Sequence, residues 1–164
     1  MQTIILETEI AAPPDRCFLL SLSIDLHMAS TAGTGERAIA GVTHGLIHLG
    51  QTVTWQGRHF GVLLTHQSVI TKYDRPRHFQ DVMVKGMFRS FQHDHFFEQS
   101  EGGTRMRDEL RFAAPFGALG GIAERLVLRR YLTKFLRERN DMIRRTAEDG
   151  NLAWQLYLKD SGVH

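Results

Sequence analysis

The sequence predicts an α+β protein in which about seven antiparallel strands form one sheet that packs on a long C-terminal helix. Residues 36–112 contain short segments rich in β-forming residues, separated by turn residues, as is typical of sequential antiparallel strands. Residues 118–149 then carry apolar side chains at helical spacing. One sheet has to bury one face, and this helix is the obvious partner for it.

The N-terminal part predicts a strand over 2–10, where apolar residues alternate with polar ones. Pro13, Pro14 and Asp15 then offer a helix start, because proline is tolerated in a first turn. We therefore expect a short helix over 14–24 and a second one over 26–30. The stretch TAGTG at 31–35 reads as a loop.

Six further strands are expected, because glycine, proline and aspartate turns divide the central part of the chain. Pro115 and Gly117 end the last of them. Their expected ranges are 36–40, 51–60, 63–73, 78–84, 88–99 and 104–113.

The expected last helix has two apolar stripes, and the change from one to the other falls near Leu126 and Leu128. Either the helix is continuous and touches different neighbours, or it breaks near 127–130 and its first piece covers a cavity.

The tail, 150–164, contains Trp154 and three leucines. It could dock on the body, dock on a second copy of the chain, or stay disordered.

Composition narrows the class of protein. The 164 residues suit one domain, with 42% hydrophobic and 23% charged residues. The formal net charge of +2 is too small to imply nucleic acid as a partner. Cys17 is the only cysteine, so no internal disulfide can form. No apolar run is long enough for a membrane span, and the N-terminus has no signal-peptide pattern, so we expect a cytoplasmic protein.

Four motifs are similar to those of one superfamily. They are IAAPPDRCF at 10–18, ITKYDRPRHFQDVMVKGMFRSFQHDHFF at 70–97, GGTRMRDELRFAAPFGALG at 102–120, and RN at 139–140. With this element order they resemble the START-like helix-grip (SRPBCC) superfamily, and within it a bacterial cyclase/dehydrase-like, ligand-binding subgroup that includes polyketide cyclase-like proteins. The resemblance covers residues 1–149 as one helix-grip domain and leaves 150–164 as a tail.

The resemblance implies a curved sheet that grips the C-terminal helix across an elongated cavity. Such cavities receive hydrophobic or amphipathic small molecules, whether lipid-like, polyketide-like or aromatic. No residue here matches a catalytic motif of a characterised enzyme in the superfamily. We expect no cofactor, and either a monomer or a homodimer.

Polar residues recur on one face of the predicted hairpin FQHDHFFEQSEGGTRMRDELRF at 91–112. In a strand, alternate residues share a face, so Asp108 points inward while its arginine and glutamate neighbours point to water. If Gln99 pairs with Thr104 around the turn, His95 lies directly opposite Asp108, with Cβ atoms ~5 Å apart. Asp81 looks inward on the preceding strand by the same test.

Three interpretations of these side chains compete. They are a buried pair that satisfies itself, a polar group that orients a ligand in an apolar cavity, or a catalytic pair in which Asp108 supports His95 as acid or base. Two histidines and a carboxylate also match facial-triad iron sites. No further ligand is evident in the sequence, so we expect no metal.

We therefore predict that the protein binds a small molecule in a cavity between sheet and helix. One alternative is a cyclase, aromatase or hydrolase that uses His95 and Asp108, and another is a regulatory domain that binds a partner.

The other histidines, including His27, His59 and His66, show no mutual spacing typical of a site. The basic last helix allows weak contact with an anionic membrane surface. The expected site residues are Trp55, Asp81, Met83, Phe91, His93, His95, Asp108, Leu110 and Phe116.

Overall fold

The computed structural model describes residues 1–114 and 127–159. Its element order confirms the predicted α+β class, with one strand, two short helices, six strands and a C-terminal helix. The elements are β1 (Gln2–Ile10), α1 (Pro14–Ser21), α2 (Ile24–Ser30), β2 (Arg37–Gly41), β3 (Thr52–His59), β4 (Val62–Asp74), β5 (His78–Lys85), β6 (Ser90–Ser100), β7 (Gly103–Ala113), α4 (Arg129–Glu148) and the 3₁₀ helix η2 (Ala153–Tyr157).

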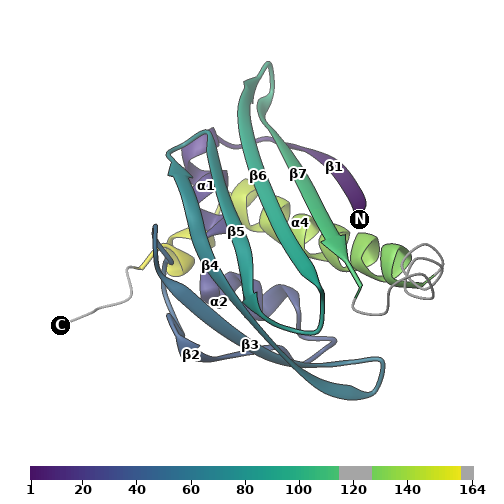
Figure 1. Ribbon diagram of the computed structural model, residues 1–164. Coiled ribbons are helices and arrows are strands. Elements are labelled where there is room, and N and C mark those ends of the chain that lie inside the picture. Colours follow the sequence, from purple (N-terminus) through teal and green to yellow (C-terminus); the bar gives the residue numbers. More distant parts are fainter. Residues whose placement is uncertain (115–126, 160–164) are drawn as a thin grey trace.

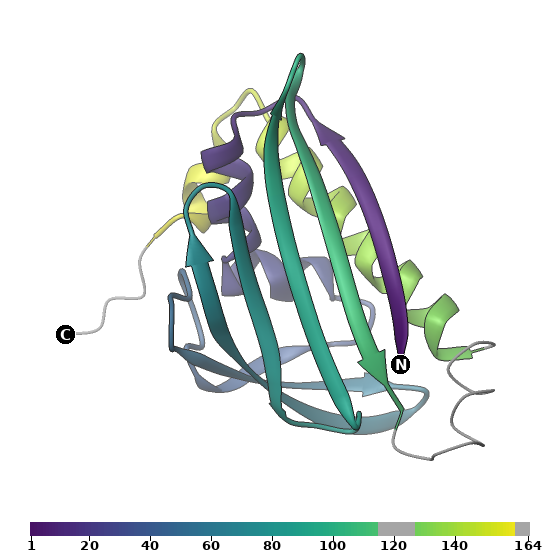
Figure 2. The same ribbon diagram turned by 45° about the horizontal axis from the view of Figure 1, so that its top comes forward.

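Within the described residues, seven strands form one antiparallel sheet in the order β1-β7-β6-β5-β4-β3-β2. Strands β2 to β7 follow one another as a meander, and β1 closes the far edge by pairing with β7. Figures 1 and 2 show that this sheet curves and that α4 lies against its concave side, with α1 and α2 beside it. This is the helix-grip architecture that the sequence predicts.

Helix α4 packs on β1, α1 and α2 because its apolar residues fall on one side. Leu132, Leu136 and Ile143 are spaced by four and seven residues, and all three are buried. Residues 127–128 run into α4 with the wider winding of a π-helix. The predicted helical stretch 118–126 lies outside the described residues. The predicted break near 127–130 falls where the π-helical residues 127–128 meet α4, so the winding changes there but the described chain stays helical from residue 127 onward.

The predicted helix over 14–24 is wrong at its end, because α1 stops at Ser21 and α2 begins at Ile24 rather than at residue 26. Ser23 is the cause. Its backbone is extended, with φ −74° and ψ 116°, and its hydroxyl accepts a hydrogen bond from the backbone N–H of Leu26 at 3.3 Å. A serine in this role caps a new helix and does not continue the old one.

The core between α1 and the sheet is aromatic. Phe18 is fully buried and meets Tyr73, Phe79 and Phe97 edge to face, with ring centroids 5.2–5.5 Å apart. Cys17 beside it is also fully buried, and burial raises the pKa of its thiol. The sequence-based interpretation of Cys17 as a core residue is therefore confirmed.

Of the three possible positions of the tail, the described part adopts docking on the body. The guanidinium of Arg16 lies 4.2 Å over the ring of Trp154. Trp154, Tyr157 and Leu158 pack against the main hydrophobic core. Within 1–114 and 127–159, no helix is long and apolar enough to cross a membrane.

Candidate functional site

A cavity of about 180 Å³ lies between the concave face of the sheet, α2 and α4. Most side chains around it are apolar or aromatic, as is typical of sites for small molecules. Trp55 of β3, Ile70 of β4, Phe91 of β6 and Leu132 of α4 are examples. Two groups of histidine and carboxylate side chains interrupt this apolar wall.

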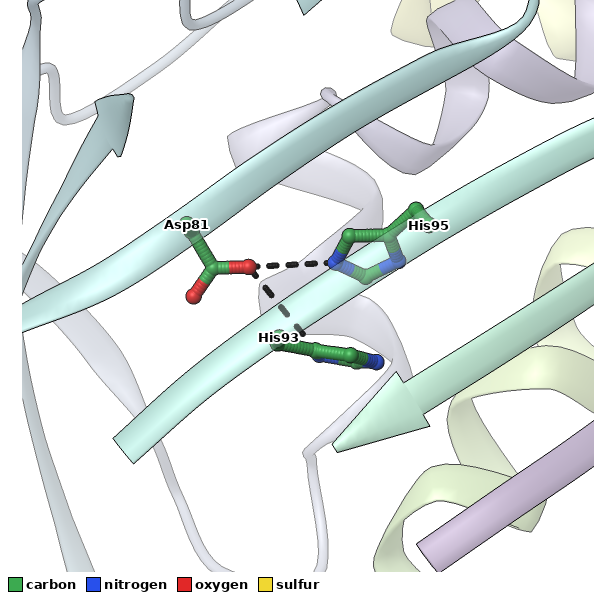
Figure 3. Close-up of side chains that lie close together, drawn as sticks. All are labelled: Asp81, His93 and His95. Carbon is green, nitrogen blue, oxygen red and sulfur yellow. Dashed lines mark hydrogen bonds and ion pairs between the residues drawn. The ribbon is translucent and has the colours of Figure 1, made fainter. Parts of the chain in front are cut away.

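The first group, here called the Asp81 cluster, consists of Asp81, His93 and His95. Figure 3 shows that the Asp81 carboxylate on β5 faces both imidazole rings on the neighbouring strand β6. Its Oδ2 atom lies 3.0 Å from Nε2 of His95 and 4.0 Å from Nδ1 of His93. All three residues line the cavity, although only the Asp81 side chain has substantial exposure, at 19%.

Asp108 stands behind this cluster on β7, where the structure confirms the predicted register. Gln99 pairs with Thr104, and His95 pairs with Asp108. The Oδ1 atom of Asp108 lies 2.9 Å from Nδ1 of His95 and also 2.9 Å from Nε2 of His93. The predicted proximity of His95 and Asp108 is therefore confirmed, and one carboxylate oxygen faces both rings.

Asp108 is fully buried, and α4 supplies its remaining partners. The Asn140 amide donates a hydrogen bond of 2.6 Å to Oδ2, and the Arg139 guanidinium lies 3.6 Å from Oδ1. Burial alone would raise the pKa of Asp108, but its contacts with His93 and His95 outweigh burial and hold the pKa well below its ordinary value. Asp108 is therefore an anion behind the cavity wall.

Asp81 is also held as an anion. Burial alone would raise its pKa, but the hydrogen bond with His95 and the nearby ring of His93 lower it to about 2. Burial lowers the pKa of His93, and the neighbouring His95 ring lowers it further. Two carboxylates thus flank two closely spaced rings, whose centroids are 3.7 Å apart.

The second group, here called the Glu36 cluster, consists of Glu36, His27 and His59. Nε2 of His27 lies 2.8 Å from Oε2 of Glu36, and Nε2 of His59 lies 3.4 Å from Oε1. Nδ1 of His59 is 2.5 Å from the hydroxyl of Tyr131 on α4. Burial would raise the pKa of Glu36, yet the two histidines lower it to about 2.

A third histidine–carboxylate group, formed by His78 and Asp94, lies on the convex face of the sheet, away from the cavity. Asp94 is buried there and accepts hydrogen bonds from Gln80 at 2.8 Å and Gln92 at 2.9 Å. His78 Nε2 lies 2.8 Å from the same carboxylate. Asp94 thus has three partners of its own and provides a natural control for the cavity residues.

The structure places the expected site residues in three ways. Six of them line the cavity: Trp55, Asp81, Phe91, His93, His95 and Leu110. Asp108 lies directly behind that wall. Met83 is half-buried on β5 outside the lining, next to a bulge in the pairing with β4, and bulges re-aim side chains. Phe116 falls outside the described residues.

Sequence reasoning missed the Glu36 cluster and the partners of Asp108 on α4. The Glu36 cluster draws its residues from separate elements, so no spacing in the sequence indicates that His27, Glu36 and His59 meet. His66 was also missed. His66 lines the cavity. Burial lowers the pKa of its ring, although the nearby carboxylates of Asp81 and Glu36 act in the opposite direction and raise it. One usable signal was the RN motif at 139–140, whose two side chains both approach Asp108.

No protein-family model matches the chain, and no curated protein matches it in sequence. Solved structures do resemble it. TTHA0849 from Thermus thermophilus is 15% identical with a TM-score of 0.68, covering 87% of this chain and 97% of that one. CV1439 from Chromobacterium violaceum is 10% identical with a TM-score of 0.69, covering 91% and 99%.

A plant protein has the same architecture. Ginseng major latex-like protein 151 from Panax ginseng is 15% identical with a TM-score of 0.66, and the match covers 90% of this chain and 98% of that one. At such identities these similarities show the fold alone. They place the chain among proteins with the helix-grip fold.

Proposed function

We propose that the protein binds a hydrophobic or amphipathic small molecule in the cavity between the sheet and α4. The observation that carries this proposal is the cavity of about 180 Å³, with aromatic and aliphatic walls and two polar clusters. Apolar walls favour the body of a ligand, and a few polar groups orient its head. Trp55, Phe91 and Leu110 supply the apolar contacts, and the Asp81 cluster supplies polar ones.

Saturable binding of 8-anilinonaphthalene-1-sulfonate tests this function. We expect about one dye per chain. Leu110→Trp fills the cavity and weakens dye binding at least ~10-fold, or ~1.4 kcal/mol. The matched control is Val84→Trp, because Val84 is 56% exposed on β5 and lies outside the cavity lining.

Overpacking by Leu110→Trp costs about 1–3 kcal/mol of stability, so folding is checked first by circular dichroism. If that variant does not fold, Val53→Phe fills the cavity from β3. An absence of saturable dye binding in the parent protein overturns the proposal. The same holds if affinity is unchanged in a folded variant with a filled cavity.

Acid–base catalysis by His95 is the second candidate, and one contact favours it. Asp108 lies 2.9 Å from Nδ1 of His95, while the other ring nitrogen, Nε2, faces Asp81 on the cavity wall at 3.0 Å. A carboxylate behind a histidine fixes the orientation of the ring. Asp108 is too buried to touch a substrate, so it would act as a positioning residue.

Hydrolysis of p-nitrophenyl butyrate by metal-free protein tests this second candidate. His95→Gln abolishes turnover if His95 is the acid or base, whereas His78→Gln on the convex face does not. Equal rates in both variants exclude this role for His95. A closed interior would favour the partner-binding alternative, whereas a cavity lined by His95 supports both small-molecule functions.

A further inference from the structure

Three ligand-type atoms of the Asp81 cluster converge on one point of the cavity wall. They are Oδ2 of Asp81, Nδ1 of His93 and Nε2 of His95, and all lie within 4.8 Å of one another (Figure 3). Two ligands bound ~2.1 Å from one metal ion lie about 3.0–3.4 Å apart. The 3.0 Å separation between Asp81 and His95 already fits this range, whereas His93, whose Nδ1 atom lies 4.0 Å from Asp81 and within 4.8 Å of His95 Nε2, has to move closer to complete the site.

The far side of each ring faces Asp108. Its Oδ1 atom is 2.9 Å from the second nitrogen of both histidines. In the described structure none of these three buried atoms has a well-aligned hydrogen bond. A carboxylate behind a metal-binding histidine is the usual arrangement, because it holds the proton on the far nitrogen and leaves the near lone pair for the metal.

Charge also favours a cation at this point. The carboxylates of Asp81 and Asp108 lie on opposite sides of the two rings, and the guanidinium of Arg139 lies 3.6 Å from Oδ1 of Asp108. If each ring keeps its proton for Asp108, the Nε2 lone pair of His95 faces Asp81 at 3.0 Å. A proton or a metal ion has to lie between those two atoms, since two acceptors in contact repel each other.

We propose that Asp81, His93 and His95 bind a divalent first-row transition-metal ion, with Asp108 as the positioning residue behind both histidines. Two imidazoles and one carboxylate on one side leave the other coordination positions open, as in non-haem iron and catalytic zinc sites. Here those positions face the cavity, where water or an oxygen donor of a ligand completes the shell. From the sequence no metal was expected, because no further ligand was evident beside two histidines and one carboxylate; the geometry assigns the part of the carboxylate to Asp81.

The Glu36 cluster also combines two histidines with one carboxylate, but its ligand atoms do not converge in this way. His27 and His59 contact different oxygens of Glu36, so the carboxylate lies between the rings. Each histidine Nε2 atom therefore already has its own oxygen of Glu36 as a partner. This cluster therefore serves as an internal comparison for the metal site.

The test uses tag-free, full-length protein from which metal has been removed with a chelator. Zn(II) binding is measured by calorimetry and Co(II) binding by visible absorption. We expect one ion per chain and competition between the two ions. Asp81→Asn weakens binding at least ~100-fold, and Asp108→Asn weakens it ~10–100-fold, as for other residues behind metal ligands. The matched control Asp94→Asn, on the convex face, changes affinity less than about threefold.

A second readout needs no variant and stays informative if Asp81→Asn fails to fold. The Co(II) protein should show two hyperfine-shifted, exchangeable proton signals, one from each imidazole N–H that faces Asp108. Fewer than one ion per chain, an absence of such signals, or equal weakening by Asp81→Asn and Asp94→Asn overturns the proposal. Loss of the site through Glu36→Gln instead would place the metal in the other cluster and also overturn it.

Dye binding and metal binding fail independently. Metal-free protein that binds dye but no Co(II) supports the cavity function and excludes the metal site. Protein that binds Co(II) but no dye supports the metal site and excludes the apolar ligand.

Discussion

The Asp81 cluster and the Glu36 cluster each combine two histidines with one carboxylate, yet they are built differently. In the Asp81 cluster the side chains come from adjacent strands and their ligand atoms converge. In the Glu36 cluster they come from α2, the residue before β2, and β3, and the carboxylate separates the two rings. The first arrangement leaves capacity for a ligand, while the second satisfies itself and ties α2 to the sheet.

The difference arises from what stands behind the rings. A second carboxylate, Asp108, occupies the back of His93 and His95. Behind His59 there is a neutral hydroxyl, that of Tyr131, and the ring of His27 stacks on Trp55 with centroids 4.1 Å apart. Composition alone therefore does not decide whether a histidine–carboxylate group is a site; the second layer of contacts does.

Removal of Asp108 should have the largest effect. Asp108→Ala leaves two imidazoles, an amide and a guanidinium without their buried partner, so the free energy of unfolding should fall by about 3–5 kcal/mol. Urea denaturation measures this. The matched control Glu109→Ala removes an outward-facing carboxylate of the same strand that pairs with Arg107 and Arg111, and should cost under about 1 kcal/mol. Equal losses of unfolding free energy in the two variants would show that the buried contacts of Asp108 do not stabilise the fold.

Acid should weaken the Glu36 cluster next. The folded-state pKa of Glu36 is about 2 against an ordinary 4.5, so its stabilising contribution is present above pH ~4.5 and is lost as the pH falls toward 2. Between pH 5 and 2 the wild-type protein should lose about 2–3 kcal/mol more than Glu36→Gln. Urea midpoints at several pH values measure the difference. Parallel pH profiles for the two proteins would contradict the ion-pair arrangement.

Tyr131→Phe should have the smallest effect. It removes the hydroxyl beside Nδ1 of His59 and leaves the ring on α4 in place, so we expect a loss of about 1 kcal/mol. Thermal unfolding measures it, with Tyr157→Phe in η2 as the control. A loss as large as that for Asp108→Ala would mean that both clusters have equally critical second layers.

The sequence predicted the β6–β7 part of the site because strand geometry is local. Period-two alternation and a short turn determine which residue faces which, so His95 opposite Asp108 followed from counting. The roles of Trp55, Phe91 and Leu110 in binding remain predictions. Asp81 was expected to face inward, but its approach to both histidines depends on the pairing of β5 with β6, which no local turn specifies.

The rest depended on tertiary packing. Glu36 and His59 meet because β2 and β3 pair and α2 lies beside them, and Arg139 and Asn140 reach Asp108 only because α4 crosses the concave face. Residues that meet across separate elements have no fixed sequence spacing. The boundary between α1 and α2 was missed for a different reason, since Ser23 can lie within a helix or cap one, and its surroundings decide.

Cys17 gives the chain its own reporter of opening. The thiol is fully buried, its Sγ lies 3.9 Å from the carbonyl oxygen of Ala12, and burial keeps it protonated at neutral pH. A protonated thiol without access to solvent does not react with alkylating reagents. Cys17 is the only cysteine, and it becomes modified only in molecules whose α1 has separated from the sheet. The rate at which the protein gains mass under pulse alkylation therefore measures how often this opening occurs.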